Sequence, residues 1–384
     1  MSQPQKNPDA IVIGAGIVGA CSALSLTNAG LKVMIIDRGT VASGTTGAGE
    51  GNILVSDKDP GPELVLALRS RDLWFEMQED VGDTFELEAK GGVVVARNDD
   101  SQLMALAKVQ SANGVTAQVV DSKELHQLEP YLHPEISSGV FYPQDAQCQP
   151  MLAAAKIIQT VISRGGTLVS RSKVLGFDIK DGAVVAVNTS TGKYSAPIVI
   201  NAAGTWAGEI AALAGSNLPV APRRGFILVT EPAPQYIFHK VYDSDYVANV
   251  ASSDADLQTS TVVEGTRSGT ILIGASRERV GFDGSMNYEI LRKLAQQAVS
   301  LFPVLRDVQL LRAYRGFRPY APDHLPLIGE DYAVKGLWHS AGHEGAGIGL
   351  APGSAALITD SILGRSSFMD ATAFSPKRFA EVTV

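Results

Sequence analysis

Cysteine, histidine and long apolar runs are scarce in this 384-residue sequence, and each scarcity excludes a class of protein. Cys21 and Cys148 are the only cysteines, too few for a disulfide framework, an iron–sulfur cluster or a four-thiolate metal site. The six histidines have no ligand spacing on one helix face, so we expect no metal. No apolar stretch suggests a signal peptide or a membrane span. We therefore predict a protein of the reducing cytoplasm.

Positive charge is also in short supply. The formal net charge is −8 and no run of Lys or Arg occurs, which argues against nucleic acid or anionic lipid as the main partner. The sequence is rich in glycine, with 38 residues, and 45% of its residues are hydrophobic. A chain of this length and composition is expected to form two lobes with many tight turns, and a cleft between lobes is the default place for a binding site.

The segment AIVIGAGIVGACSALSLTNAGLKVMIID has the order strand, glycine turn, helix and strand. Gly14, Gly16 and Gly19 form a GxGxxG pattern, which gives a tight turn, close approach to a pyrophosphate and close packing of helix on strand. The second strand ends at Asp37, where a carboxylate accepts the ribose hydroxyls of an adenosine and repels a 2′-phosphate. This order predicts a dinucleotide site, but the motif does not separate NAD from FAD.

Two further stretches of small residues have similar features. SGTTGAGEGN, residues 43–52, offers hydroxyls and backbone N–H groups that can hold a pyrophosphate and then a ring, with a flexible surface linker as the alternative. IVINAAGTWAG places Ala202, Ala203 and Gly204 directly after a buried strand. We expect both stretches to border the same ligand as the first glycine turn.

The chain is predicted to pass repeatedly between two domains. Residues 1–85, 147–219 and 316–384 are assigned to a discontinuous Rossmann-like α/β domain that binds the dinucleotide. Residues 86–146 and 220–315 alternate more and contain more turn signals, which predicts a mainly antiparallel β domain for the substrate. The two domains are therefore interleaved rather than joined in series.

Five motifs together resemble the D-amino-acid oxidase superfamily of flavoenzymes, over nearly the whole chain. They are VIGAGIVG, SGTTGAGEGN, VINAAGTWAG, RGFRPYAPDHLPLIG and GHEGAGIGLAPGSA. The glycine oxidase, sarcosine oxidase and D-amino-acid dehydrogenase branch is the most similar. Within it, the chain looks most like the β subunits of heteromeric dehydrogenases for hydroxyproline, proline or opines. The resemblance implies a GR2-type FAD domain, extended FAD, and partner subunits that carry further electron carriers.

The resemblance and the motifs assign FAD contact mostly to small and polar residues. They are Gly14, Gly16, Ile17, Val18, Gly19, Asp37, Arg38, Ser43, Gly44, Thr45, Thr46, Gly49, Gly51, Asn52, Val174, Ala202, Ala203, Gly204, Trp206, Gly342, Gly345, Gly347 and Ile348. The C-terminal glycines are expected to wrap the flavin ring, with a helix-breaking loop as the alternative. A helix starting near Leu350 would point its N-terminal dipole at that ring.

Covalent attachment of the flavin is not expected. Sarcosine oxidases link FAD to a cysteine, and the corresponding position of this chain is Gly316. The resemblance therefore implies non-covalent FAD.

Arg318 is the first candidate for substrate binding. It matches the arginine that binds the substrate carboxylate in this family, because a guanidinium pairs with a carboxylate through two hydrogen bonds. An internal ion pair, for example with Asp323, is the alternative. The implied activity is FAD-dependent oxidation of the CH–N bond of a small amino acid or secondary-amine amino acid. Hydride transfer to the flavin gives an imine and then a 2-oxo acid.

His343, Tyr320 and Glu264 complete the predicted catalytic set. His343 is expected at the flavin. Tyr320, like Tyr314 and Tyr246, is a candidate pocket wall or hydrogen-bond donor, and ordinary packing is the favoured alternative for each. Glu264 is a candidate partner of the substrate amine, with a solvated turn as the alternative.

Glu344 has three interpretations: solvent exposure, a contact with a substrate ammonium, or a subunit interface. Three other functions also stay open for the chain. They are an oxygen-using glycine or D-amino-acid oxidase, an NAD-dependent dehydrogenase, and a non-catalytic subunit that carries flavin.

Overall fold

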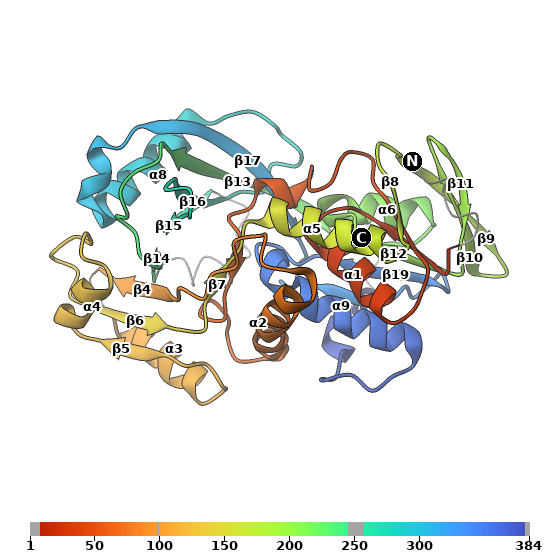
Figure 1. Ribbon diagram of the computed structural model, residues 1–384, viewed down its shortest axis with the longest axis horizontal. Coiled ribbons are helices and arrows are strands. Elements are labelled where there is room, and N and C mark those ends of the chain that lie inside the picture. The colour runs from red at the N-terminus through yellow and green to blue at the C-terminus, as the bar shows by residue number, and fades with distance from the viewer. Residues whose placement is uncertain (1–7, 98–99, 245–256, 381–384) are drawn as a thin grey trace.

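The computed structural model describes residues 8–97, 100–244 and 257–380, which form two lobes (Figure 1). One lobe contains a six-stranded sheet in the order β18-β19-β12-β1-β2-β8. The other contains an eight-stranded sheet in the order β17-β13-β16-β15-β14-β4-β6-β5. Both orders mix strands from distant parts of the sequence, so the mixed α/β fold with interleaved lobes is confirmed.

The six-stranded sheet is parallel except at one edge. Its strands are β1 (Ala10–Ile13), β2 (Val33–Ile36), β8 (Thr167–Val169), β12 (Ile198–Asn201), β18 (Leu327–Glu330) and β19 (Leu337–Ala341). β1 pairs in parallel with β2 and β12, and β18 pairs antiparallel with β19. Every residue of β1 and β2 is buried, as expected for parallel strands covered on both faces.

Helices cover one face of this sheet and a small antiparallel sheet covers the other (Figure 1). Val12 and Ile35 join a core with helices α1 (Ile17–Asn28), α2 (Pro62–Val81), α5 (Pro150–Ser163) and α9 (Gly347–Leu363). Ile11 and Met34, one position along each strand, face β9 (Val174–Lys180), β10 (Ala183–Thr189) and β11 (Gly192–Ser195). This alternation follows from the two-residue period of a strand.

The eight-stranded sheet is mainly antiparallel. Its strands are β4 (Gly92–Ala96), β5 (Gln118–Val120), β6 (Ser138–Tyr142), β13 (Ala221–Thr230), β14 (Lys240–Asp243), β15 (Gln258–Gly265), β16 (Ile271–Arg277) and β17 (Leu310–Tyr320). Phe226 and Leu228 share one core with helix α8 (Tyr288–Leu301). Tyr242 and Val262 belong instead to the core that contains α1, α2, α5 and α9. The sheet therefore presents its second face to the nucleotide lobe.

Shorter elements complete the two lobes. They are α3 (Ser101–Ser111), α4 (Ser122–Leu128), α6 (Ala207–Leu213) and the two-stranded ribbon of β3 (Asn52–Ile53) with β7 (Ala146–Gln147). The sequence places a hairpin turn at Asp181–Gly182, and both residues have the positive φ that a tight hairpin requires, +52° and +76°. The domain boundaries remain a prediction, and the one at residue 316 falls inside β17.

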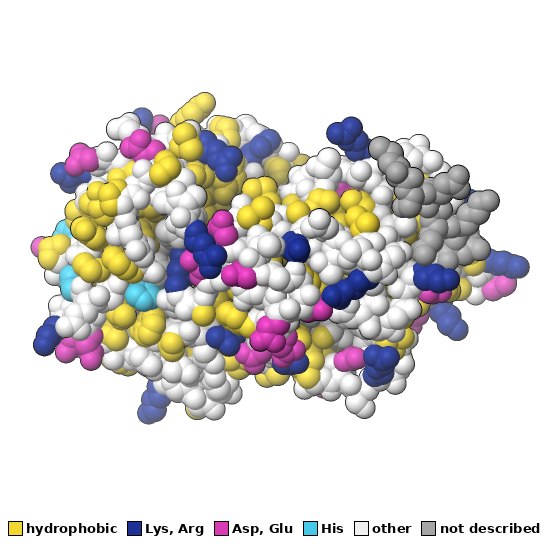
Figure 2. Space-filling view, viewed as in Figure 1, with side chains coloured by type: hydrophobic (Ala, Val, Ile, Leu, Met, Phe, Trp, Pro, Cys, Tyr) yellow, Lys and Arg dark blue, Asp and Glu magenta, His cyan; other side chains and the backbone are white. Residues whose placement is uncertain are grey.

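No helix in the described ranges is long and apolar enough to cross a membrane. On the face shown in Figure 2, basic and acidic side chains are interspersed and form no continuous basic surface.

Candidate active site

A cavity of about 750 Å³ is lined by residues of both sheets. Its lining runs from Asp37, Val174 and Trp206 in the nucleotide lobe to Gly225 and Arg318 on the second sheet. Segments near residues 13–18, 36–52, 172–175, 202–213, 225–227, 316–319 and 340–348 contribute. The cavity therefore joins both ends of the chain.

The GxGxxG turn is fixed by close packing of backbone on backbone. A Cβ atom at Gly14, where φ is +117°, would lie 2.3 Å from the carbonyl oxygen of Ala202. A Cβ atom at Gly19 would lie 2.0 Å from the carbonyl oxygen of Gly14. Gly14 lines the cavity, whereas Gly19 does not and acts through the packing of α1 on the turn. The two glycines thus serve different purposes in one motif.

Asp37 follows β2 at the wall of the cavity. Its Oδ2 accepts a hydrogen bond from the backbone N–H of Ala15 at 2.7 Å, and its Oδ1 accepts one from Gly39 at 2.6 Å. Each carboxylate oxygen has a second lone-pair site that can accept a hydroxyl. The two backbone bonds hold the carboxylate at the position that the sequence predicts for an adenosine ribose.

The loop 43–52 is folded against the nucleotide turn. The backbone N–H of Ile17 donates to Thr46 Oγ1 at 3.0 Å, at the start of α1. Thr45 Oγ1 and Thr205 Oγ1 both donate to the carbonyl oxygen of Phe317, at 2.8 and 2.7 Å. These bonds connect the loop, the segment after β12 and strand β17, so the predicted alternative of a flexible surface linker is wrong for this loop.

Aromatic contacts lie at the nucleotide end. The guanidinium carbon of Arg38 lies 3.7 Å from the ring centroid of Trp206, and the rings of Trp206 and Phe282 stack with centroids 5.5 Å apart. Arg38, Trp206 and Val174 line the cavity. They offer flat and apolar surfaces that suit an adenine ring.

Helix α9 is held at its first turns by side chains from α2. Pro352 has no N–H, so it leaves the carbonyl oxygen of Ile348 without its usual helical donor. The indole N–H of Trp74 donates to that oxygen at 3.0 Å. The sequence predicts a start near Leu350, and the helix begins three residues earlier, at Gly347.

Not every glycine of the C-terminal segment faces the cavity. The hydroxyl of Ser70 donates to the carbonyl oxygen of Gly349 and accepts from the N–H of Gly353, so α2 packs tightly there. A Cβ atom at Gly353 would lie 2.8 Å from Leu66 Cδ1. Gly342 has φ of +72° and does not line the cavity. Helix packing and backbone conformation therefore explain these three glycines better than ring contact does.

Gly345, Gly347 and Ile348 do line the cavity, together with His343. His343 is buried, and its Nε2 shares a hydrogen bond of 2.9 Å with Ser354 Oγ. Burial lowers the pKa of His343 to about 4, so the imidazole is neutral at physiological pH. A neutral ring held by Ser354 acts as a wall of the site beside the N-terminus of α9.

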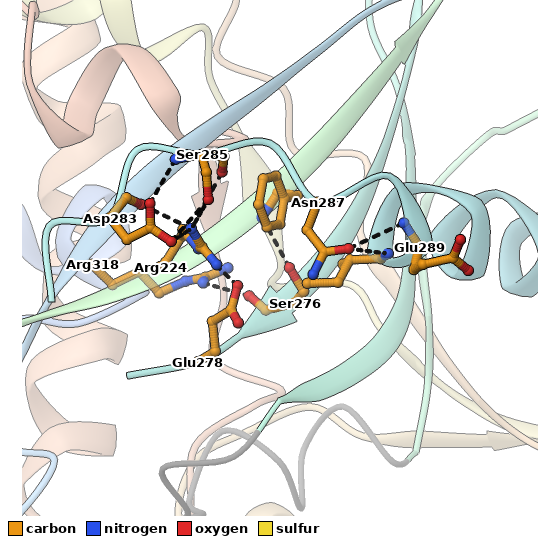
Figure 3. A network of polar contacts seen from close by, with 10 residues as sticks. Arg224, Ser276, Glu278, Asp283, Ser285, Asn287, Glu289 and Arg318 are labelled. Carbon is orange, nitrogen blue, oxygen red and sulfur yellow. Dashed lines mark hydrogen bonds and ion pairs between the residues drawn. The ribbon is translucent and has the colours of Figure 1, made fainter. Parts of the chain in front are cut away.

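Arg318 lies on β17 and borders the cavity (Figure 3). Its Nη1 donates to the carbonyl oxygen of Ser276 at 2.7 Å. A Cβ atom at Gly225 would lie 2.2 Å from the same Nη1, so only glycine leaves room for the guanidinium there. Asp323, the suggested internal partner, is paired with Arg378 at 2.6 Å. The Arg318–Asp323 alternative is therefore wrong.

Figure 3 also shows Arg224, from the neighbouring strand β13. Arg224 binds Glu278 at 2.8 Å and Asp283 at 2.7 Å. It is buried and absent from the cavity lining. Arg224 therefore ties the segment after β16 to the sheet, while Arg318 faces the ligand space.

Two of the tyrosine candidates, Tyr320 and Tyr314, lie outside the cavity lining. Tyr320 is buried at the end of β17, beyond the cavity, where its ring meets His324 edge-on with centroids 5.3 Å apart. Tyr314 is partly buried and absent from the lining, and burial together with the charge of Glu50 raises its pKa. Tyr246 lies outside the described residues.

Glu264 is fully buried on β15, so the predicted alternative of a solvated turn is wrong. Its Oε2 accepts from Lys240 Nζ at 2.7 Å, because neighbouring strand β14 turns Lys240 to the same side. Lys240 also donates to Asn52 Oδ1 and lies 3.8 Å from Glu50 Oε2. Glu50 and Asn52 line the cavity, whereas Glu264 lies behind them.

Glu344 is also enclosed. Its side chain is 10% exposed, forms an ion pair with Arg223 and shares a hydrogen bond of 2.8 Å with His324 Nδ1. Burial alone would raise the pKa of Glu344, but the hydrogen bond from His324 and the charge of Arg223 outweigh it and lower the pKa. Solvent exposure is therefore wrong for this residue, which borders the cavity as an ionised carboxylate.

The cavity has the features that FAD requires. Twenty-one of the twenty-three predicted cofactor residues line it, all except Gly19 and Gly342. Ser340 Oγ is buried in the lining with no hydrogen-bond partner among the described residues. Neither Cys21 nor Cys148 is in the lining, and both are buried free thiols. The site thus combines an adenosine end, an α1 N-terminus suited to pyrophosphate and a glycine-bordered ring space.

Sequence reasoning missed several lining residues. They include Glu50, Gly225, Ile227, Phe317 and Ser340. Glu50 had a usable signal, because it is the only charged residue in a loop of small and polar residues. Gly225 and Ile227 had none, because the strand pattern does not reveal which face meets another lobe.

The fold and the cavity define a flavin-dependent oxidoreductase of two lobes, and comparison with known proteins agrees. The family model for DAO, FAD dependent oxidoreductase, matches residues 9–361. The chain belongs to this family and binds FAD.

Relatives and solved structures extend this similarity. The chain is 26% identical to the glycine oxidase of Pseudomonas putida, over 96% of this chain and 98% of that protein. It is 29% identical to the bifunctional protein ThiO/ThiG of Trichormus variabilis, over 94% of this chain and 53% of that protein. The chain thus spans about half the length of that relative. The L-proline dehydrogenase of P. horikoshii has the same fold, with a TM-score of 0.89 and 24% identity, over 98% of this chain and 99% of that one.

Proposed function

We propose that this protein oxidises the CH–N bond of a small amino acid or secondary-amine amino acid. The observation that carries the proposal is Arg318, a guanidinium at the cavity wall, seated on Gly225 beside the glycine-bordered ring space. A guanidinium in this position suits the carboxylate of a small substrate. The names of the relatives, glycine oxidase and L-proline dehydrogenase, give the same substrate class.

FAD supplies the redox chemistry when it is bound, by accepting a hydride from the carbon that carries the amine. The residues of the chain then have to bind, orient and enclose the substrate. Arg318 would hold the carboxylate, and its own position is fixed by Ser276. This restriction aligns the reacting carbon and is worth more to the rate than any single side-chain acid or base.

The walls of the cavity would keep water away from the reacting amine. Ile227, Ile348 and the neutral ring of His343 present apolar or uncharged surface to it. A dry site favours the neutral form of a substrate amine, which is the form that loses a hydride. The imine product then reacts with water to give a 2-oxo acid and ammonia or an amine.

We further propose that the FAD is non-covalent and that a partner chain, rather than oxygen, accepts the electrons. The first proposal is supported by the position of both thiols outside the cavity. The second is supported by the GTTGAGEGNIL and GHEGAGIGLAPG motifs. Slow return of the flavin absorbance in air after anaerobic reduction is the expected result, and reoxidation within seconds would contradict a partner-dependent enzyme.

The deciding experiment is an anaerobic substrate panel on the purified holoenzyme. Glycine, sarcosine, D-alanine, both prolines, D-hydroxyproline and opines are added, and bleaching of the flavin band is followed. At least one compound should bleach the flavin. Bleaching by none of them would overturn the proposal.

Arg318→Leu tests the residue that carries the proposal. Loss of a charge-assisted pair should raise the half-saturating substrate concentration about 100-fold while the flavin stays bound. Arg378→Leu is the matched control, because that guanidinium pairs with Asp323 outside the cavity. Unchanged saturation in Arg318→Leu would remove this residue from substrate binding.

A further inference from the structure

Two buried carboxylates near the cavity share one ammonium group. Lys240 Nζ lies 2.7 Å from Glu264 Oε2 and 3.8 Å from Glu50 Oε2. The other oxygens, Oε1 of Glu50 and Oε1 of Glu264, are buried without a hydrogen-bond partner among the described residues. Lys90, the next ammonium, donates to the carbonyl oxygen of Gly265. A buried carboxylate oxygen without a hydrogen-bond donor lowers the stability of the folded state. We therefore expect a further donor group, outside the protein, to pair with this cluster.

Of these two carboxylates, only Glu50 borders the cavity. Its side chain is 6% exposed. Asn52 Nδ2 donates to its Oε2 at 3.1 Å and so fixes that oxygen on the side of Lys240. The unpartnered Oε1 lies over β16, where a Cβ atom at Gly274 would be 2.3 Å away. Only glycine at position 274 leaves the space that the Glu50 carboxylate occupies.

Glu50 and Arg318 lie over neighbouring positions of the same strand. Oε1 of Glu50 is at Gly274, and Nη1 of Arg318 is bonded to the carbonyl oxygen of Ser276, two residues along β16. Two residues of a strand span on the order of 6 Å. An α-amino acid can bridge a gap of this order, because its nitrogen and its carboxylate are bonded to the same carbon atom and each forms a hydrogen bond of about 2.8 Å at an angle to the line between the two side chains.

We propose that Glu50 binds the amine end of the substrate opposite Arg318, an assignment that rests on the proposed function. The pair would select compounds that carry an amine with an N–H group and a carboxylate on the same carbon, because the Glu50 carboxylate can accept a hydrogen bond from that N–H group. Lys240 and Glu264 act through Glu50: the ammonium holds the carboxylate in place, and Glu264 holds the ammonium. Glu50 is thus a specificity residue, and Lys240 and Glu264 are positioning residues.

Glu50→Gln tests this assignment in the holoenzyme, because the amide keeps the shape of the side chain and removes its charge. Two ligand classes are compared. The first is the amino acid that bleaches the flavin fastest in the panel. The second is carboxylates without an amine, acetate, propionate and tetrahydro-2-furoate, whose dissociation constants are read from the perturbed absorbance of bound FAD.

The two ligand classes should respond in opposite directions. The half-saturating concentration of the amino acid in anaerobic bleaching should rise about 10- to 100-fold, as expected for a lost charge-assisted hydrogen bond. The carboxylates should bind equally well or more tightly, because a nearby negative charge has been removed. Equal weakening of both classes, or no change in the first, would overturn the assignment. So would loss of FAD from Glu50→Gln, which would place Glu50 in the cofactor site.

Glu88→Gln is the matched control, because it removes a carboxylate that pairs with Arg267 and does not border the cavity. It should change the response to both ligand classes by less than about threefold, since solvent screens this partly exposed carboxylate from the ligand. A change as large as that in Glu50→Gln would mean that overall negative charge, rather than contact with Glu50, selects the substrate, and would overturn the assignment. If no amino acid bleaches the wild-type flavin, the proposed function fails and Glu50 is not at issue.

Discussion

The two ends of the cavity are built in different ways. At the nucleotide end, residues 10–37 are contiguous, and the contacts are made by backbone groups, small residues and one carboxylate held by two backbone N–H groups. At the proposed substrate end, Glu50, Lys240 and Arg318 come from three distant segments, and the contacts are made by charged side chains, of which Glu50 and Lys240 are buried and Arg318 is partly buried.

This difference implies that residues at the proposed substrate end can change without any change at the nucleotide end. A backbone-lined turn tolerates almost no added atom, so it stays matched to the same ligand. Side chains on the second sheet can be exchanged without altering the turn, and the catalytic chemistry of the cofactor is retained. The glycine oxidase of Pseudomonas putida is 26% identical in sequence to this chain, and the L-proline dehydrogenase of P. horikoshii has the same fold at 24% identity.

The largest effect is expected at the nucleotide end, from Gly19→Val. The new side chain would meet the carbonyl oxygen of Gly14 at 2.0 Å, and backbone on both sides prevents relaxation. We expect loss of bound FAD and a fall of about 3 kcal/mol or more in the free energy of unfolding. FAD per chain and thermal unfolding measure this outcome.

Gly176→Ala serves as the control for that substitution. Gly176 has no atom within 4 Å of an added Cβ and no positive φ. It should keep its full FAD content and wild-type stability to within about 0.5 kcal/mol. A normal flavin content in Gly19→Val would show that the nucleotide end is more tolerant than its backbone contacts indicate.

A smaller overall effect is expected at the proposed substrate end, from Lys240→Met, because this variant should lose stability but keep its FAD. This change leaves Glu50 and Glu264 buried without their shared ammonium, which should cost about 3–5 kcal/mol of unfolding free energy. Lys240→Met combined with Glu264→Gln should recover part of that loss, because one of the stranded charges is removed. The comparison of single and double variants by chemical denaturation measures the coupling. An equally unstable double variant would mean that packing rather than charge sets the loss.

The smallest effect concerns Asp145, which lies on the inner side of the second sheet and accepts hydrogen bonds from Val55 N and Ser56. Burial raises the pKa of Asp145 to about 7, above the usual value of 3.8, and the hydrogen bonds of Ser56 oppose the shift. The folded state therefore keeps a proton that the unfolded state releases. Stability from this group is fully present below about pH 4 and is lost as the pH rises to about 7.

Asp145→Asn should remove that part of the pH dependence. The unfolding free energy of the wild type should fall by about 2 kcal/mol relative to Asp145→Asn between pH 5 and pH 7. Urea unfolding of both proteins at several pH values gives the difference. A difference that does not vary with pH would mean that Asp145 titrates alike in both states.

The sequence predicted elements well where a pattern is local. β1, the glycine turn, α1 and β2 follow the predicted order of strand, turn, helix and strand, and Asp37 lies where its spacing places it. Predictions were wrong where the environment decides. Glu264 and Glu344 were each given a solvent-exposed alternative, and both are enclosed by charges that other segments supply.

The C-terminal glycines show the same limit. The number of these glycines indicated close contacts with the backbone, but not whether a ligand or another part of the protein makes them. Gly345 and Gly347 border the ligand space, whereas Gly349 and Gly353 make room for the neighbouring strand and for α2. The sequence does not distinguish a glycine that borders a ligand from a glycine that packs against another element of the protein.

The sequence by itself determined the nucleotide-binding unit, because spacing along one short segment sets the geometry of a strand, a turn and a helix. Five motifs spread along the chain indicated the family and, through the family, FAD. Only the tertiary structure decided which charges lie at the proposed substrate end. Glu50, Lys240 and Arg318 are far apart in the chain, and sheet order and side-chain direction bring them together. Their protonation and pairing depend on burial, which is a property of the assembled fold.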